Sequence, residues 1–244
     1  MPNILGIIPA RAGSKRLPGK NKKNFLGKPL IKNIIDTALK SNLLDSIVVT
    51  TDDLEIIEYQ EDYPTINFLH RPKAISGDNS PSIEYVNHAL TQLRSKFQPF
   101  DIIVILQPTS PLTLAADIDA TIKTLIDSKM ESAVSVVKLD HAIHPIKMKT
   151  LKGVQLNPFL EEEKGRMAES ELPEIYVRNC SVYATRIDVI RAGRIISESC
   201  AAYIMPRERS IDINDATDFK FAEFLVREQM QSDFEKGLSK LKFS

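Results

Sequence analysis

Four cationic residues lie close together near the N-terminus, in a loop whose other members are mostly small. They are Arg11, Lys15, Arg16 and Lys20, and an apolar run at residues 4–8 shortly precedes them. Small residues allow a polyanion to approach the main chain, where N–H groups and cationic side chains can hold it. Ligands of open α/β sheets bind beyond the carboxyl ends of strands, which is where this loop is expected to lie. A phosphate-binding loop is therefore favoured over a solvated basic turn.

The loop carries neither of the two most familiar phosphate motifs. The string G-x-x-x-x-G-K-[ST] is absent, which excludes a P-loop nucleoside triphosphatase, and the absence of G-x-G-x-x-G argues against a dinucleotide fold. Residues 9–21 read P-A-R-A-G-S-K-R-L-P-G-K-N. This string resembles the N-terminal motif of the cytidylyltransferases that activate sialic acids and related nine-carbon acidic sugars. It fits every fixed position of that motif, P-A-R-x-G-S-K-[RG]-x-P-x-K-N.

The resemblance implies roles for the residues of this loop. Arg11, Ser14, Lys15, Lys20 and Asn21 are expected to bind the phosphates and base of CTP. Nucleotidyl transfer is accelerated chiefly by positioning and by stabilisation of charge. Arg11 and Lys20 are therefore the expected catalytic residues, and Lys20 is expected to stabilise negative charge on the α-phosphate in the transition state.

A second stretch resembles the family's nucleotide motif R-P-x-x-x-x-x-D-x-s-x-S. By this resemblance Arg71, Ser80 and Ser82 are expected to help bind the cytidine nucleotide. From the residues alone, Arg71 as a surface arginine and the two serines as helix caps remain alternatives.

Two more strings resemble the part of the family that binds the acceptor sugar. L-Q-P-T-S-P-L, which contains Gln107, is similar to L-Q-P-T-S-P-L-R, with Thr113 in place of the final arginine. Y-V-R-N-C-S-V-Y is similar to y-x-x-N-G-A-I-Y, and its asparagine and last tyrosine are Asn179 and Tyr183. Gln107, Asn179 and Tyr183 are therefore expected to bind the sugar. Cys180 replaces the usual glycine. A strand is still expected here, but the backbone conformation at residue 180 is not predicted.

The string S-I-D-I-N at residues 210–214 resembles the family's S-I-D-I-D, whose two carboxylates hold magnesium. Mg²⁺ prefers hard oxygen ligands, often one or two carboxylates together with phosphate oxygens and water. Asp212 is the expected first ligand, and Asn214 would offer only an uncharged amide oxygen. Water, pyrophosphate, or Asp215 in a shifted register are alternatives for the second place, and Asp212 could merely precede a helix.

Apolar runs and helical patterns alternate along the chain. Strands are expected at about residues 4–8, 47–51, 66–69, 102–106, 133–137, 181–184 and 201–205. Helices are expected at about residues 29–41, 80–96 and 114–128, and from 216 onward. This alternation predicts one α/β domain over residues 1–244: a Rossmann-like, mostly parallel central sheet with helices on both faces. The resemblance implies the nucleotide-diphospho-sugar transferase type of this fold. Pro9 has no N–H to donate and is expected to end the pairing of the first strand.

The alternation breaks at about residues 139–175. A structureless loop of that length would be unusual, so a strand-bearing excursion is expected. The resemblance implies that this is a dimerisation segment reaching over the partner's active site, in which Lys147 binds the acceptor's carboxylate and Arg166 is the second basic residue. Two nearby histidines, 141 and 144, lack the third ligand of a typical metal site, so a surface role is favoured.

The whole-chain totals exclude several classes of partner. The 32 basic and 32 acidic residues balance, so no global field recruits nucleic acid or an acidic membrane. Two unpaired cysteines, no visible signal peptide and no membrane-spanning run predict a cytoplasmic protein.

The function implied by the resemblance is transfer of CMP from CTP to the anomeric hydroxyl of a nonulosonic acid, with Mg²⁺ as cofactor, in a homodimer. N-acetylneuraminic, legionaminic and pseudaminic acids are the candidate acceptors. One alternative is the related enzyme for the eight-carbon ketodeoxyoctonate sugar, whose loop the string L-P-G-K at residues 17–20 echoes. Another is a paralogue that binds CTP without turnover, which Asn214 keeps open.

Overall fold

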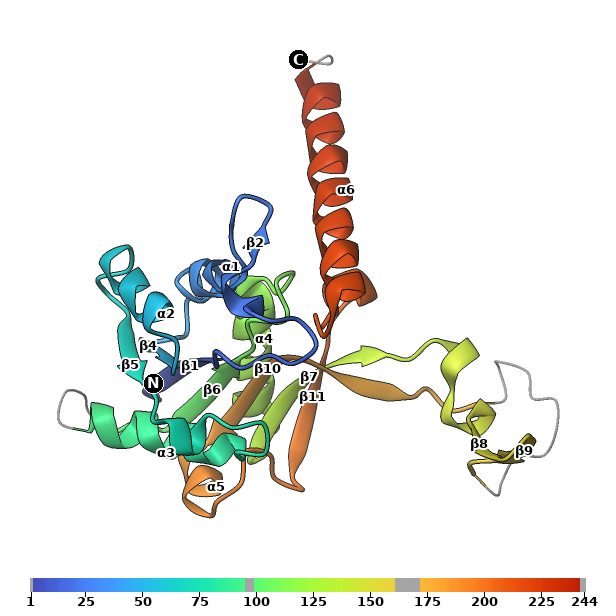
Figure 1. The fold of residues 1–244 in the computed structure, drawn as a ribbon, viewed down its shortest axis with the longest axis horizontal. Coiled ribbons are helices and arrows are strands. Elements are labelled where there is room, and N and C mark those ends of the chain that lie inside the picture. The colour runs from blue at the N-terminus through green and yellow to red at the C-terminus, as the bar shows by residue number, and fades with distance from the viewer. Residues whose placement is uncertain (1, 95–98, 161–171, 242–244) are drawn as a thin grey trace.

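A computed structural model of the chain describes residues 2–94, 99–160 and 172–241, with side chains as far as residue 232. Its main element is a seven-stranded sheet in the order β11-β7-β10-β6-β1-β4-β5 (Figure 1). The strands are β1 (Ile4–Ala10), β4 (Ser46–Thr51), β5 (Asn67–His70), β6 (Ile102–Leu106), β7 (Ser132–Lys138), β10 (Tyr176–Arg186) and β11 (Cys200–Ile204). β10 is antiparallel to both neighbours, and the other pairs are parallel. The expected mostly parallel sheet is confirmed.

Helices cover both faces of this sheet. On one face lie α1 (Leu30–Ala38), α2 (Leu54–Glu58) and α4 (Ala115–Ser128), and on the other lie α3 (Ser82–Leu93) and α5 (Ile187–Arg191). β1 serves both layers: Ile4 and Ile8 belong to the first core cluster, and Leu5 and Ile7 to the second. The apolar run at the N-terminus is thus a strand buried on both sides, as predicted.

The expectation for Pro9 was wrong. β1 continues to Ala10, and Pro9 lies opposite Thr50 of β4. Pairing with β6 stops earlier, at Ile7. Along a strand, the backbone N–H and C=O groups of successive residues point alternately to the two neighbouring strands. The carbonyl of Asn3 accepts from Asp101 on the β6 side, so the backbone nitrogen of Pro9, an even number of residues further on, also points to that side. The missing N–H therefore falls where no ladder bond is made, and the strand on the β4 side is unaffected.

Short elements occupy the connections. They are η1 (Lys20–Lys22), β2 (Asn24–Phe25), β3 (Lys28–Pro29), η2 (Tyr59–Glu61), η3 (Lys73–Ile75), η4 (His141–Ile143), η5 (Pro145–Lys147) and η7 (Arg207–Arg209). Three of the connections, after β1, β5 and β6, leave the same edge of the sheet because these strands are parallel. That edge is where the candidate site lies.

The chain leaves the sheet after β7 and returns in β10, as expected for residues 139–175. In between, β8 (Lys149–Lys152) and β9 (Gln155–Pro158) pair as an antiparallel hairpin well away from the sheet (Figure 1). Leu151, Val154 and Leu156 of this hairpin are exposed. The excursion bears strands, as predicted.

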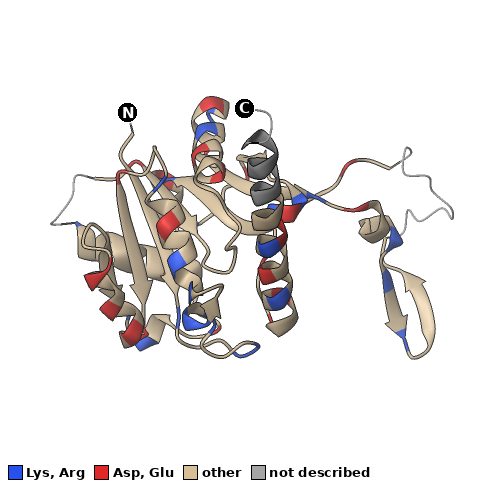
Figure 2. Cartoon of the chain, turned by 90° about the horizontal axis from the view of Figure 1, so that it is seen from above, with Lys and Arg blue, Asp and Glu red and all other residues tan. Residues whose placement is uncertain are grey.

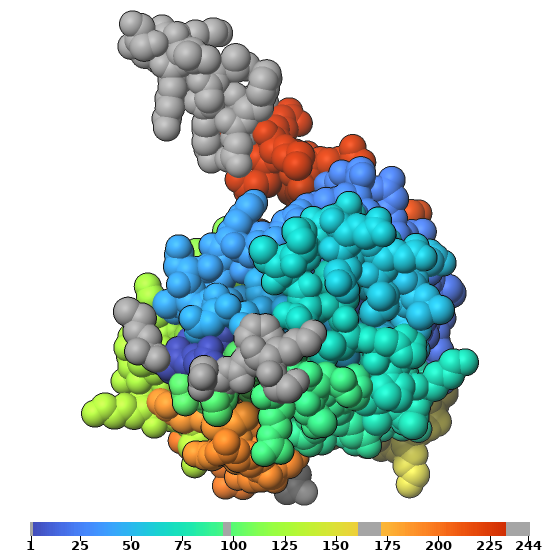
Figure 3. All heavy atoms as spheres, turned by 90° about the vertical axis from the view of Figure 1, so that its left-hand side faces the viewer, coloured from blue at the N-terminus to red at the C-terminus, as the bar shows by residue number. Residues whose placement is uncertain are grey.

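The last helix, α6 (Ala216–Leu241), begins against the basic loop. Phe219 makes an edge contact with Phe25 at 5.4 Å between ring centroids, and Ala222 packs in the same cluster with Leu17. Beyond these turns α6 rises away from the body (Figures 1 and 3). Acidic and basic residues are interspersed over the helices (Figure 2). Among the described residues, none of the helices has the length and apolarity needed to span a bilayer.

Candidate active site

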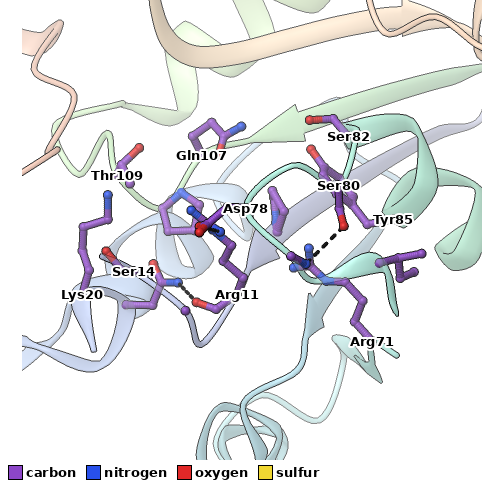
Figure 4. A pocket seen from close by; sticks show the side chains of 16 residues that line it. Arg11, Ser14, Lys20, Arg71, Asp78, Ser80, Ser82, Tyr85, Gln107 and Thr109 are labelled. Atoms are coloured by element: carbon purple, nitrogen blue, oxygen red, sulfur yellow. Dashed lines mark hydrogen bonds and ion pairs between the residues drawn. The ribbon is translucent and has the colours of Figure 1, made fainter. Parts of the chain in front are cut away.

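A cavity of about 250 Å³ lies at the carboxyl edge of the sheet (Figure 4). Residues from three connections line it: the loop after β1, the segment from β5 into α3, and the turn after β6. Those predicted from the sequence are Arg11, Ser14, Lys20, Asn21, Arg71, Ser80, Ser82 and Gln107. The topology therefore brings most of the residues predicted to bind the nucleotide, and one residue predicted to bind the acceptor, to a single cavity.

The loop after β1 is held in shape by a polar contact within it and by another with the end of β4. The Asn21 amide donates to the carbonyl of Arg11 at 3.1 Å, and the N–H of Ala12 donates to Asp52 at 2.7 Å. Gly19 adopts a left-handed conformation, with φ of 65°, directly before η1. Asn21 thus closes the loop and also lines the cavity. The backbone that carries the cations between Arg11 and Asn21 is held in place by these bonds.

Arg71 is not a surface arginine. Arg71 is only 4% exposed. Its backbone N–H donates to the carbonyl of Thr51 at 2.6 Å, and its Nη2 donates to the carbonyl of Thr50 at 2.7 Å. The guanidinium lies over the ring of Tyr85, 5.1 Å from the centroid. Burial lowers the pKa of Arg71, yet an arginine remains charged at neutral pH. Its Nε has no hydrogen-bond partner in the protein among the described residues, which leaves a buried donor beside the cavity.

The two serines do not cap α3. Pro81 is the residue before its first turn, and no side chain caps it. Ser80 instead accepts from the N–H of Gly77 at 3.1 Å, which shapes the turn that lines the cavity. The helix-capping alternative is therefore wrong for both positions.

Asp78 is a cavity residue that the sequence analysis did not assign. Its carboxylate pairs with Arg11 and, at 2.5 Å, with Lys15, and both cations lower the pKa of Asp78. Lys15 itself is mostly exposed and does not line the cavity. Tyr85 and Thr109 also line it without having been predicted. Asp78 stands at the fixed aspartate position of the nucleotide motif, and that position could have identified it as a site residue.

Lys20 connects the cavity to the 210–214 segment. Its Nζ donates to the carbonyl of Ile213 at 2.7 Å, and the N–H of Ile213 donates to Thr109 at 2.8 Å. Burial lowers the pKa of Lys20, and the nearby carboxylate of Asp212 opposes that shift. Asp212 and Asn214 lie beyond Lys20 and are not lining residues.

The donor set fits Mg²⁺ in part. Among the described residues, no cluster of three or more His, Cys, Asp or Glu is placed to hold a metal ion. Asp212 is half-buried and offers one carboxylate, so a metal here would need phosphate oxygens and water for its other ligands. The amide oxygen of Asn214 already accepts from Nη2 of Arg16 at 2.6 Å. Asp212 suits the role of ligand; in this arrangement Asn214 does not.

Asn179 and Tyr183 lie in β10, outside the cavity lining. Asn179 is 4% exposed and its amide bonds Ser135 at 2.6 Å and Ser210 at 2.9 Å, so it links β7 to the 210–214 segment. Burial raises the pKa of the Tyr183 phenol. Cys180 has φ of 60°, at a bulge that glycine would adopt without strain. The strand expected there is confirmed, and the sugar-binding roles stay predictions.

Of the two residues expected to contribute from the excursion, the structure describes Lys147 alone. Lys147 is exposed in η5, and its Nζ lies 3.1 Å from Nδ1 of His141. His144 is buried, accepting from the N–H of Ile146 at 3.2 Å, so it does not play the surface role expected of it. Arg166 lies outside the described residues.

Known proteins resemble this chain over most of its length. It is 29% identical over 220 residues to an N-acylneuraminate cytidylyltransferase of Escherichia coli, covering 90% of this chain and 51% of that one, about half its length. It is 30% identical to a pseudaminic acid cytidylyltransferase of Campylobacter jejuni, covering 94% of this chain and 99% of that one. It is 32% identical to a CMP-N,N'-diacetyllegionaminic acid synthase of Legionella pneumophila, covering 91% and 96%.

A solved structure shows the same fold. A CMP:2-keto-3-deoxy-manno-octonic acid synthetase complexed with CTP superposes with a TM-score of 0.68 at 17% identity, covering 93% of this chain and 99% of that one. The family model for cytidylyltransferases matches residues 5–239. With that match spanning nearly the whole length, the chain belongs to the cytidylyltransferase family.

Proposed function

We propose that this protein transfers CMP from CTP to the anomeric hydroxyl of a nonulosonic acid and releases pyrophosphate. The observation that carries the proposal is the convergence of Arg11, Lys20, Arg71 and Gln107 on one cavity at the carboxyl edge of the sheet. The similarity to enzymes named for N-acylneuraminic, pseudaminic and legionaminic acids supports the acceptor class.

The anomeric hydroxyl loses its proton to the solvent as its oxygen bonds the α-phosphorus, and the bond from that phosphorus to the oxygen bridging to the β-phosphate breaks, so that pyrophosphate leaves. Negative charge builds on the phosphate oxygens, so fixed cations lower the barrier. Arg11 and Lys20 are the cavity cations on the loop after β1 and take that role. Mg²⁺, held by Asp212 and phosphate oxygens, would supply additional positive charge at the pyrophosphate when bound.

The acceptor side of the site draws on more than one part of the chain. Gln107 enters the cavity from the end of β6 and would bind the sugar. We assign Lys147 to the acceptor's carboxylate in a partner subunit of a homodimer, because it lies in the exposed excursion. We further infer a cytoplasmic enzyme, which the two free cysteines, 180 and 200, support.

Pyrophosphate release from CTP and Mg²⁺ tests the proposal directly. The acceptors are N-acetylneuraminic, legionaminic and pseudaminic acids, with ketodeoxyoctonate as the eight-carbon comparison. Release with one nine-carbon acid is the expected result and names the substrate. Release with ketodeoxyoctonate alone would move the protein to the eight-carbon activity, and CTP binding without any release would overturn the proposal.

A further inference from the structure

The outgoing and returning segments of the excursion run side by side where they leave the sheet. The N–H of Leu139 donates to the carbonyl of Ile175 at 2.8 Å, and Lys138 forms an ion pair with Glu174. A cavity of about 310 Å³ lies at this place and is lined by residues of both segments, none of which belongs to the hydrophobic core clusters. Polar contacts therefore hold the two segments together here.

The imidazole of His144 connects the two segments with both of its nitrogens. The residue is 8% exposed, and Nδ1 accepts from the N–H of Ile146 in the outgoing segment at 3.2 Å. A neutral imidazole has one ring proton, so that proton must lie on Nε2. Nε2 lies 3.3 Å from the carbonyl oxygen of Pro173 in the returning segment and donates to it. A single buried ring thus joins one segment to the other.

The same histidine begins the short helix that carries Lys147. His144 directly precedes η5, whose first residue is Pro145. Proline has no N–H, so Ile146 holds the first backbone donor of this helix, and Nδ1 of His144 caps it. The N–H of Lys147 donates to the carbonyl of His144 at 2.8 Å. The main chain of Lys147 is therefore held through His144.

The ammonium group of Lys147 keeps its charge available. Lys147 is exposed, and its Nζ donates to Nδ1 of His141 at 3.1 Å. In the described part of the chain no carboxylate forms an ion pair with it. An uncharged imidazole does not cancel the ammonium charge, so an anion can still bind there. The direction in which Lys147 projects then depends on the turn that His144 caps.

We propose that His144 is a positioning residue for Lys147: its ring, with the proton on Nε2, joins the turn that carries this lysine to the returning segment and so fixes where the ammonium group meets the acceptor's carboxylate. The inference rests on the proposed function, in which Lys147 reaches the acceptor in the partner's site. None of the described residues of the excursion lines the cavity assigned to CTP. Changes at His144 should therefore alter the KM for the acid sugar and leave the KM for CTP unchanged.

Steady-state kinetics of three substitutions test the two hydrogen bonds separately. His144→Ala removes both and should raise the KM for the acid sugar about tenfold. His144→Asn places an amide oxygen near the position of Nδ1, and His144→Gln places an NH₂ group near the position of Nε2, so each should recover part of the loss. If neither recovers more than His144→Ala, the inference is overturned. Tyr176→Phe is the matched control, because the Tyr176 hydroxyl donates to Glu174 of its own segment at 2.6 Å, and it should change neither KM.

A double variant distinguishes an action through Lys147 from a general loosening of the excursion. If His144 acts through that lysine, His144→Ala combined with Lys147→Ala should have the same acceptor KM as Lys147→Ala alone. A further increase in the double variant would show that His144 supports the excursion as a whole, and the inference would be wrong. Loss of the dimer in His144→Ala alone, measured by native mass spectrometry, would lead to the same conclusion.

Amide hydrogen exchange at Ile146, followed by NMR, tests the inference without turnover. Exchange should be slow in the unmodified protein and in His144→Asn, and fast in His144→Ala and His144→Gln, because only the first two offer an acceptor to this N–H. Equal exchange rates in all four proteins would overturn the inference.

The proposed function and this inference fail in different ways. If no acid sugar is turned over but the exchange pattern is as expected, the proposed function is wrong and the positioning of Lys147 by His144 stands. If one acid is turned over and its KM is unchanged in His144→Ala, only the inference about His144 is overturned.

Discussion

Lys20 is the residue on which the proposed chemistry depends most. Its ammonium group is partly buried, it faces the cavity and it bonds the carbonyl of Ile213. Lys20→Ala should lower kcat by at least about a hundredfold, because one fixed positive charge at the developing oxyanion is lost. The fold should be unaffected, since the truncation creates no void in the core.

Steady-state pyrophosphate release, with circular dichroism and CTP binding measured on the same samples, checks this prediction. Lys22→Ala is a suitable comparison, because that lysine lies in the same short helix and pairs with Asp53 and Glu55 away from the cavity. Normal turnover in Lys20→Ala would remove the residue from the mechanism.

The ionisation of Lys20 predicts a pH dependence. Burial lowers its pKa below the usual 10.5, and the Asp212 carboxylate raises it, so removing that carboxylate should lower the pKa further. The protonated form is the active one, and activity should therefore fall as the pH rises through this pKa. In Asp212→Asn the alkaline limb of the kcat profile should shift to lower pH.

The position of the limb is the informative quantity, because Asp212→Asn also lowers the height of the profile through its proposed metal role. In Lys20→Arg the limb should move beyond the measurable range, since a guanidinium does not titrate below pH 12. A limb that keeps its position in both variants would show that another group titrates.

The positions of the motif residues were readily found from the sequence. Contacts between residues far apart in the sequence were not. Arg11, Arg71 and Gln107 each follow a strand, so a parallel sheet had to bring them together. The contacts of Asp78 with Arg11 and of Arg16 with Asn214 span 67 and 198 residues. Such contacts depend on how two loops pack against each other, and the order of residues within one loop does not determine that packing.

At the scale of elements, the apolar runs predicted the strands well because buried parallel strands are continuous hydrophobic segments. The direction of β10 was not predicted, since a run of apolar residues reads the same in either orientation. β10 returns from the excursion between β6 and β7 and is antiparallel to both. The pairing of Asn179 with Ser210 follows from this placement and could not have been anticipated.

An ion pair between a buried carboxylate and a partly exposed arginine joins α4 to the turn that precedes the 210–214 segment. Asp117 is 0% exposed and accepts from Nη2 and Nε of Arg209 at 2.6 and 3.1 Å, and from Tyr203 at 3.2 Å. Asp117→Ala should lower the free energy of unfolding by about 3 kcal/mol, because it leaves the guanidinium of Arg209 and the hydroxyl of Tyr203 without their acceptor. It should also raise the KM for CTP by loosening the segment that Lys20 contacts.

Urea unfolding measures the stability change, and the exposed pair of Asp140 with Arg207, which lies in the same short helix as Arg209, is the control. Arg207→Ala should leave the urea midpoint unchanged, since exposed pairs contribute little. Equal midpoints for Asp117→Ala and the unmodified protein would mean that the pair does not hold the segment.

At the scale of the whole molecule, two parts project from the sheet and its helices: the hairpin of β8 and β9, and the outer turns of α6 (Figure 1). Leu151, Val154 and Leu156 are exposed on the hairpin. Exposed apolar residues on a projecting element indicate a protein partner. The sequence predicted the excursion from its broken alternation, and a second subunit is the partner we propose for it.

If Lys147 serves the partner's site, two inactive variants should complement each other. In a mixed dimer of Lys20→Ala with Lys147→Ala, one site contains an intact Lys20 and receives an intact Lys147 from the other chain. Random reassociation makes half of the dimers mixed, each with one complete site, so about a quarter of normal activity should return. Mixing Lys20→Ala with the double variant should restore none, because no complete site can form. Mixed dimers detected by native mass spectrometry but lacking activity would place Lys147 outside the partner's site.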